Sequence, residues 1–445
     1  MLGGPNFFLG PAKSPERPDP AIEATAPAPA RARARRQRRR IRWRPFLRKL
    51  HGWLALATGV VLLLVVLSGT ILLFQPELSK IINPGLYEST PTEDPITPAE
   101  ALRNVREEMP KLNDASTIVL QRGIYMVYTA DYARQINVDP GTGEVLGASD
   151  SEAGFLGFVS NLHLCGLSCK GYPGYIPWLK NRVEVLGNRP TIGGLILGIS
   201  ALVLIVLSVS GLFLWWPGIK RMAKGLKVRR GKGRYATHYD LHKVFGFVAL
   251  PFLLMWAFTG ASFEFEQFEK AWYGILPGEQ PDPKELPTFE SKPGSGDGIN
   301  PAQAQNAALA AVPGAELTSI TLPGRDDRKG YYDVWLTDGY DSFRASEWPG
   351  DAEVAVDRWS GRTQIMWSGP EAERPASQVL WEDWSYPIHA GLAVGWLPRG
   401  VWLAFGQVPL MLAVTGVTVW WIRRRKRRAK RGRTPAGGAG ANGAA

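Results

Sequence analysis

The chain is poor in the two residue types that most often hold metals, with two cysteines and five histidines among 445 residues. It has no HExxH motif and no cluster of cysteines, which argues against a zinc site. The chain also contains a long stretch without charged residues, since Trp53–Phe74 has no Asp, Glu, Lys or Arg. Such a stretch is longer than the apolar part of a signal peptide, which spans about 7–15 residues.

Four stretches of the chain are apolar and long enough to cross a hydrocarbon core of about 30 Å, which takes about 20 helical residues. They are Trp53–Phe74, Ile192–Trp216, Val244–Phe263 and Val401–Ile422. The sequence therefore predicts four transmembrane helices, with the lipid bilayer as their surroundings.

Basic residues gather in short segments beside these stretches. Arg31–Lys49, Lys220–Lys243 and Arg423–Arg433 hold 29 of the 52 lysines and arginines, whereas the two long connections, roughly residues 75–191 and 266–396, are acidic. Because basic loops stay in the cytoplasm, we expect a multi-pass protein of the inner or plasma membrane with both termini inside and both long connections outside. Three basic runs that all adjoin spans indicate topology, so no nucleic acid is predicted as a partner.

The chain repeats itself. The pairs Leu50-His51 and Ser68-Gly69 recur 191 residues later as Leu241-His242 and Thr259-Gly260, and Ser210-Gly211 recurs 205 residues later as Thr415-Gly416. In the long connections, residues 97–101 resemble 300–304 and residues 138–144 resemble 356–362, which indicates a capped helix start and a turn between strands in each copy. Both copies start on the same side, so sites are expected where the two copies meet.

The histidines follow the same repeat. His51 and His242 stand at the basic ends of their spans, and His163 and His389 precede the second and fourth spans, which leaves His238 as the only histidine without a counterpart. Two neutral imidazoles on facing helices can hold a haem iron from both sides. We interpret nearby glycines as positions where a flat macrocycle approaches the backbone; these are Gly52, Gly59, Gly69, Gly246, Gly260, Gly391 and Gly395.

In combination these features resemble the PepSY-associated transmembrane family, which includes iron-regulated membrane proteins and ferric-siderophore reductases. The resemblance covers residues 45–425 and rests on LHGWLALATGVVLLLVVLSG, its copy LHKVFGFVALPFLLMWAFTG, the TPAEA and NPAQA modules, and the two spans that end in WW. It implies an α-helical integral membrane protein of four transmembrane helices in two parallel repeats, with two α+β PepSY-like outer domains. It also implies two b-type haems (haem b) with histidine pairs as axial ligands, and electron transfer from the cytoplasmic side to an iron chelate outside.

Carried onto this chain, the resemblance makes His51 and His242 the ligands of an inner haem iron and His163 and His389 those of an outer one. This pairing is inferred from shared membrane depth. His238 lies one helical turn before His242, so it is an alternative ligand or a cytoplasmic surface residue.

The domain organisation follows from the spans and the resemblance. In chain order it comprises a disordered basic cytoplasmic tail (1–44), transmembrane helix 1 (45–76), outer PepSY-like domain 1 (77–190), transmembrane helix 2 (191–217), a basic cytoplasmic loop (218–240), transmembrane helix 3 (241–266), outer PepSY-like domain 2 (267–396), transmembrane helix 4 (397–422) and a basic, Gly/Ala-rich cytoplasmic tail (423–445).

The two cysteines, Cys165 and Cys169, follow His163 closely. An outer, oxidising setting favours a disulfide between them, with a redox-active pair or metal contacts as the alternatives. The basic segments are too short to hold a flavin or dinucleotide-binding domain. Electrons would therefore come from quinol or from a separate cytoplasmic donor.

Three functions are compatible with the sequence. The first is a haem-dependent oxidoreductase that reduces a ferric siderophore or another iron chelate. The second is a non-catalytic membrane protein whose PepSY-like domains bind or restrain an outer partner such as a peptidase. The third is a metal transporter, against which the absence of a carboxylate in the middle of the spans counts.

Overall fold

The computed structural model describes residues 43–431 except 113, 122, 131–133, 151–152, 186, 277–286, 338–349, 351, 369–375, 383 and 392–395. The chain divides into two units, Met1–Pro45 and Phe46–Ala445, and the fold below is that of the second. The predicted tail of residues 1–44 lies outside the described residues apart from Trp43 and Arg44, which begin the first helix.

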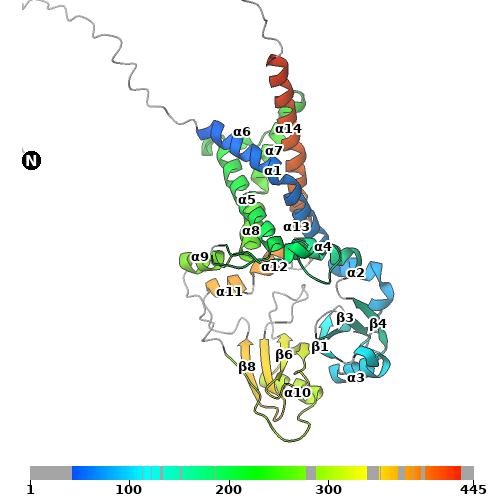
Figure 1. Cartoon of the computed structure of the whole chain (residues 1–445). Coiled ribbons are helices and arrows are strands. Elements are labelled where there is room, and N and C mark those ends of the chain that lie inside the picture. Colours follow the sequence, from blue (N-terminus) through cyan, green and yellow to red (C-terminus); the bar gives the residue numbers. More distant parts are fainter. Residues whose placement is uncertain are drawn as a thin grey trace, which may run out of the picture. The chain divides into compact units, whose positions relative to one another are not determined.

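Among the described residues, three helices are long and apolar enough to cross a membrane, and a bent pair of helices makes a fourth span if it is counted as one. The prediction of a membrane protein is thereby confirmed, with three or four spans. They are α1 (Trp43–Leu72), α5 (Ile192–Trp215), the stretch Arg399–Ala429 across α13 (Trp396–Gly406) and α14 (Val408–Arg431), and the bent pair α7 (Arg234–Val248) and α8 (Leu250–Ser262) (Figure 1).

The third span differs from its expected form. Its helix already begins at Arg234, and it bends by 59° between Val248 and Leu250. Pro251 explains the break, because proline has no N–H for the bond to the carbonyl four residues earlier and its ring clashes with that carbonyl. The last span also runs further than residue 422, since α14 continues through a series of arginines and lysines, which are good helix formers.

The long connections contribute four strands each to one antiparallel sheet. The strand order is β4-β3-β2-β1-β5-β6-β7-β8, so the chain fills one half of the sheet before the other. The strands are β1 (Ala115–Gln121), β2 (Ile124–Thr129), β3 (Arg134–Val138), β4 (Val145–Asp150), β5 (Glu316–Thr321), β6 (Tyr331–Thr337), β7 (Ala352–Asp357) and β8 (Thr363–Ser368).

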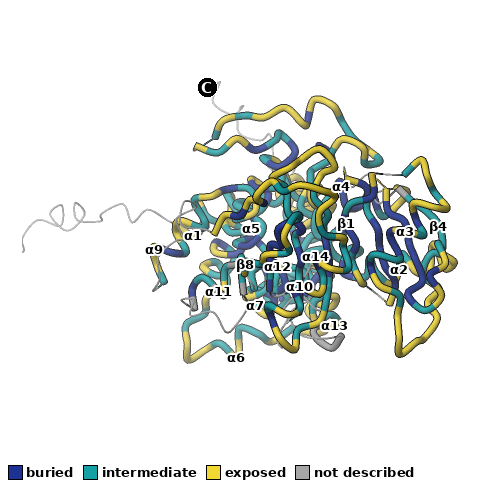
Figure 2. Tube along the Cα trace, turned by 90° about the horizontal axis from the view of Figure 1, so that it is seen from below, coloured by how far each residue is buried: buried dark blue, intermediate teal, exposed yellow. Residues whose placement is uncertain are grey.

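The two halves of the sheet join where β1 pairs with β5. Ile118 of β1 lies opposite Ile320 of β5, and both side chains are almost fully buried. A single hydrophobic core contains these isoleucines together with Val105, Val334 and Val356. Buried residues are dense in the sheet (Figure 2), and α5 and α8 also contain several, whereas Ser68 is the one buried residue among those described in α1. The two connections therefore fold as one sheet with one core.

One helix from each connection covers the same face of this sheet. α3 (Pro98–Glu108) and α10 (Pro301–Ala311) each begin with a capping box and a proline in the first turn, so the predicted helix starts are confirmed. Residues of both helices belong to the shared core. The two copies thus use the same local signals in equivalent places.

The turn between strands is also repeated. Asp139 accepts hydrogen bonds from Thr90 N, Gly141 N and the Thr142 hydroxyl at 2.9–3.0 Å. Asp357, its counterpart, accepts from three backbone N–H groups at 2.8–2.9 Å. Burial alone would raise the pKa of Asp139, but these hydrogen bonds outweigh it and lower the pKa to about 2.

Shorter helices complete the described chain. The α-helices are α2 (Gln75–Ile82), α4 (Gly154–Cys165), α6 (Met222–Gly225), α9 (Gln267–Ile275), α11 (Ala376–Glu382) and α12 (Ser385–Ala390), and the 3-10 helices span Pro84–Tyr87, Pro110–Leu112, Pro177–Lys180 and Ile219–Arg221. Two of them, α4 and α12, carry His163 and His389.

Candidate functional site

The structure brings four of the five histidines together in two pairs. The ring centroids of His51 on α1 and His242 on α7 are 6.3 Å apart, with the ring planes at 88°. Those of His163 on α4 and His389 on α12 are 6.2 Å apart, with the planes at 47°. These are the two pairs that the sequence groups by membrane depth; their role as haem ligands stays a prediction.

Both histidines of the first pair use Nδ1 for a hydrogen bond to a neighbouring helix. Nδ1 of His51 is 2.9 Å from the Ser210 hydroxyl on α5. Nδ1 of His242 is 3.0 Å from the Thr415 hydroxyl and 3.1 Å from the Leu412 carbonyl on α14. A carbonyl can only accept, so Nδ1 of His242 carries the proton.

The second pair is held in the same way. Nδ1 of His163 is 2.8 Å from the Val65 carbonyl and 3.2 Å from the Ser68 hydroxyl on α1. Nδ1 of His389 is 2.7 Å from the Thr259 hydroxyl on α8. The four hydroxyls belong to the Ser-Gly and Thr-Gly pairs of the sequence repeat, so the repeat extends to the hydrogen bonds of the histidines.

Carbonyl groups fix the tautomer of two of the four rings. The Val65 and Leu412 carbonyls can only accept, so Nδ1 of His163 and of His242 carries the proton and Nε2 keeps a free lone pair. Each of the four hydroxyls also lies within hydrogen-bond distance of a carbonyl of its own helix, three or four residues earlier. The donor–acceptor distances are 2.8 Å for Ser68 to Val65, 3.2 Å for Ser210 to Leu207, 2.8 Å for Thr259 to Met255 and 2.7 Å for Thr415 to Met411.

The glycine after each hydroxyl residue leaves room for the ring. A Cβ added to these glycines would lie 2.6 to 3.7 Å from Cε1 of the histidine. Only the shortest distance lies below 3.0 Å, so a side chain in place of Gly69 would force the His163 ring to shift. The distances are 2.6 Å for Gly69 and His163, 3.2 Å for Gly416 and His242, 3.5 Å for Gly211 and His51, and 3.7 Å for Gly260 and His389.

The glycines proposed for a macrocycle therefore have mixed surroundings. Gly69 and Gly260 contact histidine rings, whereas Gly52 and Gly59 have no atom within 4 Å of an added Cβ. Gly246 is in ordinary contact with Leu412, Gly391 lies against Trp402, and Gly395 lies outside the described residues.

The ring spacing can be compared with the spacings expected for two bridged imidazoles. With a metal–nitrogen bond of about 2.0 Å and a ring centre about 1.1 Å behind the nitrogen, two imidazoles on opposite sides of one metal have centroids about 6.2–6.3 Å apart. On a tetrahedral zinc the centroids would be about 5.1 Å apart. A direct hydrogen bond between the rings gives about 5.2 Å. The observed 6.3 and 6.2 Å are longer than the spacings for a shared tetrahedral zinc or a direct hydrogen bond, and they lie within the 4.5–7 Å at which unbridged aromatic rings also pack.

A zinc site lacks further support. In the described part of the chain, no group of three or more His, Cys, Asp or Glu side chains is arranged to hold a metal ion. A haem needs only two protein ligands, so this result bears on zinc alone.

His238 takes no part in the first pair. The ring facing His51 is that of His242, one turn further along α7. Nδ1 of His238 is buried and has no hydrogen-bond partner among the described residues.

Cys165, the last residue of the helix that carries His163, forms a disulfide with Cys169. The same turn is held by Asn161, which is fully buried and bonds the Cys169 amide at 3.1 Å and the Pro173 carbonyl at 3.1 Å. Both sulfur atoms are used in this bond and are not available to a metal. The disulfide thus stabilises the end of α4 next to the second histidine pair.

A buried carboxylate organises the opposite end, next to the first pair. Asp240 on α7 has no exposed side-chain surface and pairs with Arg229 at 2.7 Å and Lys243 at 2.9 Å. Lys243 also reaches the Gly225 carbonyl at 3.5 Å. Asp240 lies two residues before His242, so these bonds tie the α5–α7 connection to the helix that carries this histidine.

Sequence reasoning missed the role of Ser68, Ser210, Thr259 and Thr415. They stand out only as repeated Ser-Gly and Thr-Gly pairs, and a repeat by itself does not say which side chain the hydroxyl meets. The signal was present, because each pair lies at the depth of a histidine in a neighbouring span.

A family model described as the PepSY-associated TM region matches residues 48–423, which is most of the chain and includes all five histidines. No curated protein matches the chain.

Proposed function

The chain belongs to the PepSY-associated TM family, and we propose that it carries electrons across a membrane on two b-type haems, one between each pair of histidines. The observation that carries this proposal is the ring spacing of 6.3 and 6.2 Å in two separate pairs. A haem iron held by two histidines supplies one-electron exchange.

The residues around each pair serve this role by holding the imidazoles ready. His51 and His242 would hold one iron, and His163 and His389 the other, each through Nε2. The hydrogen bonds at Nδ1 keep the rings oriented and make them better ligands, as second-shell acceptors do in metal sites. Because these acceptors lie on neighbouring helices, the packing of the helices sets the ring positions before a haem arrives.

The distance between the pairs suits a relay with two steps. His51 and Ser68, which contacts His163, are seventeen residues apart on α1. At 1.5 Å per residue this is about 25 Å along the helix, too far for one haem to serve both ends. A second haem divides this distance.

We further propose that the His51 end faces the cytoplasm and the shared sheet faces outward. The three basic segments, with 29 of the 52 lysines and arginines, adjoin the spans on that side, which supports this orientation. Electrons would enter from quinol or a cytoplasmic donor and leave to a ferric siderophore or another iron chelate. The acceptor is proposed from the resemblance to ferric-siderophore reductases.

An absorbance spectrum tests the central claim. Protein expressed with ample haem and purified from membranes should show the absorbance of ferrous b-type haem after chemical reduction, and it should contain two haems per chain. The matched control replaces all four histidines by alanine and should be colourless. A wild-type protein free of haem under these conditions would refute the proposal and favour a non-catalytic role in binding an outer partner.

Single substitutions then test the pairing. His51→Ala or His242→Ala should each remove the same haem and spare most of the other, and His163→Ala or His389→Ala should remove the other haem. His238→Ala should change little, because His242 is the ring opposite His51. If His51→Ala and His163→Ala remove the same haem, the pairing is wrong. Loss of haem in His238→Ala but not in His242→Ala would move the ligand by one turn.

A further inference from the structure

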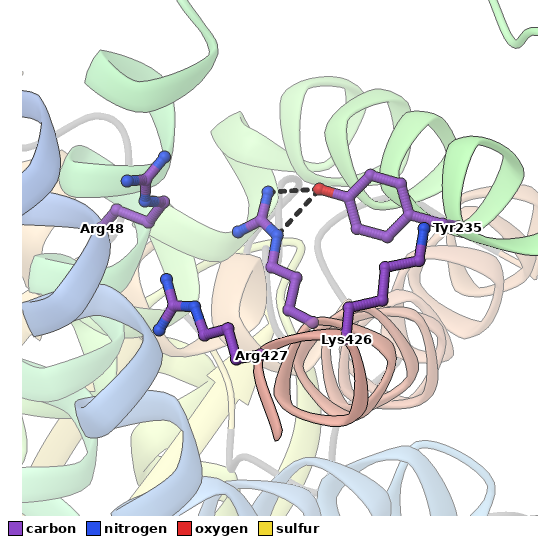
Figure 3. Close-up of a pocket in the computed structure, with 5 residues that line it drawn as sticks. Arg48, Tyr235, Lys426 and Arg427 are labelled. Carbon is purple, nitrogen blue, oxygen red and sulfur yellow. Dashed lines mark hydrogen bonds between the residues drawn. The ribbon is translucent and has the colours of Figure 1, made fainter. Parts of the chain in front are cut away.

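Near the His51 end of the helices, a cavity of about 370 Å³ is lined by four cations and one tyrosine. They are Arg48 of α1, Tyr235 of α7, and Arg423, Lys426 and Arg427 of α14 (Figure 3). Nε of Arg423 donates to the Tyr235 hydroxyl at 2.8 Å, and none of the described residues that line the cavity carries a carboxylate.

No described carboxylate pairs with the charges in this cavity. Among the described residues, the ion pairs include none of the four cations, and the nearby Asp240 is already paired with Arg229 and Lys243. Guanidinium groups bind carboxylates and phosphates through paired hydrogen bonds, and like charges that face one space repel each other. The cavity is therefore suited to a ligand with more than one negative charge.

The cavity shares its three helices with the first histidine pair. Arg48 lies three residues before His51, Tyr235 seven residues before His242, and Arg423 eight residues after Thr415, the hydrogen-bond partner of His242. At 1.5 Å per residue these are steps of about 4.5, 10.5 and 12 Å, all toward the same end of the helices. Spacings of three and seven residues also keep Arg48 and Tyr235 on the helix faces of their histidines.

We propose that this cavity binds the two propionate carboxylates of the haem held by His51 and His242, an inference that rests on the proposed function. A haem placed among apolar helices carries two carboxylates that cannot stay unpaired in hydrocarbon. The cavity offers four cations on two of the helices that surround this pair, and it lies toward the end of these helices, where charge is tolerated. It thereby fixes which way the haem points.

The test uses a chain with His163→Ala and His389→Ala, so that only the first pair can take up haem, with gel filtration and circular dichroism as checks of folding. Haem-free protein is titrated with protohaem and with its dimethyl ester, in which the carboxylates are blocked. The ester should bind about 10- to 100-fold more weakly, the loss expected for charge-assisted hydrogen bonds.

The charge is then removed from the protein side. Arg423→Gln with Arg427→Gln should weaken protohaem binding by a similar factor and leave ester binding unchanged. The matched control is Arg424→Gln with Arg425→Gln, which removes the same charge from side chains that stack on Trp420 and Trp421 outside the cavity. The ratio of the affinities for protohaem and for the ester should be the same in this control as in the parent protein.

The inference is overturned, while the proposed function stands, if the parent protein binds protohaem and its ester equally well. It is also overturned if Arg423→Gln/Arg427→Gln still prefers protohaem to the ester as strongly as the parent does. If neither protohaem nor its ester binds, the proposed function fails, and the inference fails with it. Retention of phosphatidylglycerol that depends on these arginines, with discrimination unchanged, would assign the cavity to a lipid phosphate instead.

A measurement on the intact chain gives a second test. Without the arginines, the negative charge of the propionates is no longer compensated, and this charge favours ferric over ferrous iron. Arg423→Gln/Arg427→Gln should therefore lower the midpoint potential of one haem and leave the other unchanged. Two unchanged potentials would contradict the proposal.

Discussion

Gly69 and Gly260 occupy equivalent positions in the repeat, but their surroundings differ in a way that alanine can reveal. An added Cβ at Gly69 would lie 2.6 Å from Cε1 of His163, whereas at Gly260 it would lie 3.7 Å from Cε1 of His389. The first distance is impossible for two carbon atoms, and the second is ordinary van der Waals contact. Gly69→Ala should therefore disturb the second histidine pair, and Gly260→Ala should not.

The size of the effect follows from the same distances. To restore contact at about 3.4 Å, the His163 ring must retreat by about 0.8 Å, which an iron–nitrogen bond of about 2.0 Å cannot absorb. Overpacking of this kind costs about 1–3 kcal/mol, or about 5- to 150-fold in haem affinity. The opposing gain from alanine in a helix is only about 0.5–1 kcal/mol. At Gly69 the cost of overpacking should exceed the gain in helix propensity, whereas at Gly260 only the gain in helix propensity should be present.

The assay is the haem content per chain of purified protein, combined with a redox titration that separates the two haems. Gly69→Ala should retain the His51–His242 haem and lose most of the other, while Gly260→Ala should retain both. Both variants should elute from gel filtration as the parent does. The reasoning fails if Gly69→Ala keeps two haems with unchanged midpoint potentials, or if Gly260→Ala loses haem as readily.

Three further predictions test other features. Thr259→Val removes the hydroxyl bonded to Nδ1 of His389 and should raise the midpoint potential of one haem, because a less basic imidazole stabilises ferric iron less. The control is Thr58→Val, since the described contacts of the Thr58 hydroxyl lie within its own helix; this variant should leave both potentials unchanged. Because folding lowers the pKa of Asp139 from 3.8 to about 2, its contribution to stability is present above the unfolded pKa of 3.8 and is lost progressively as the pH falls from there to about 2. Hydrogen-exchange protection factors over residues 134–150 should therefore fall in this pH range, and Asp139→Asn should remove that part of the pH dependence. Labelling of single cysteines near residues 120 and 330 should occur from outside the cell and near 228 and 435 only from inside, and outside labelling of residues 220–235 would overturn the proposed orientation.

Hydropathy was sufficient to locate the spans, because crossing a membrane demands a long uncharged helix and few other structures tolerate one. The local signals in the long connections were equally direct. A capping residue followed by proline predicts a helix start by itself, which is why α3 and α10 begin where the sequence indicates. Pro251 is also visible in the sequence, but hydropathy alone does not separate α7 from α8, because the residues on both sides of this proline are apolar.

The grouping of the histidines came from the repeat, since equivalent residues in a parallel repeat reach the same depth. Their actual distances depend on how α1, α4, α7 and α12 pack, and helix packing is decided by side chains far apart in the sequence. The hydrogen bonds from Nδ1 to Ser68, Ser210, Thr259 and Thr415 join residues on different helices for the same reason.

Only the tertiary structure decided that the two long connections share one sheet. The pairing of Ile118 with Ile320 brings together strands about two hundred residues apart, and nothing local to either strand specifies its partner. The basic cavity has the same origin. Arg48, Tyr235 and Arg423 are ordinary residues of three different helices, and they face one space only because those helices converge. Periodicity and charge along one chain determine what each segment is, whereas contacts between segments determine what the segments build together.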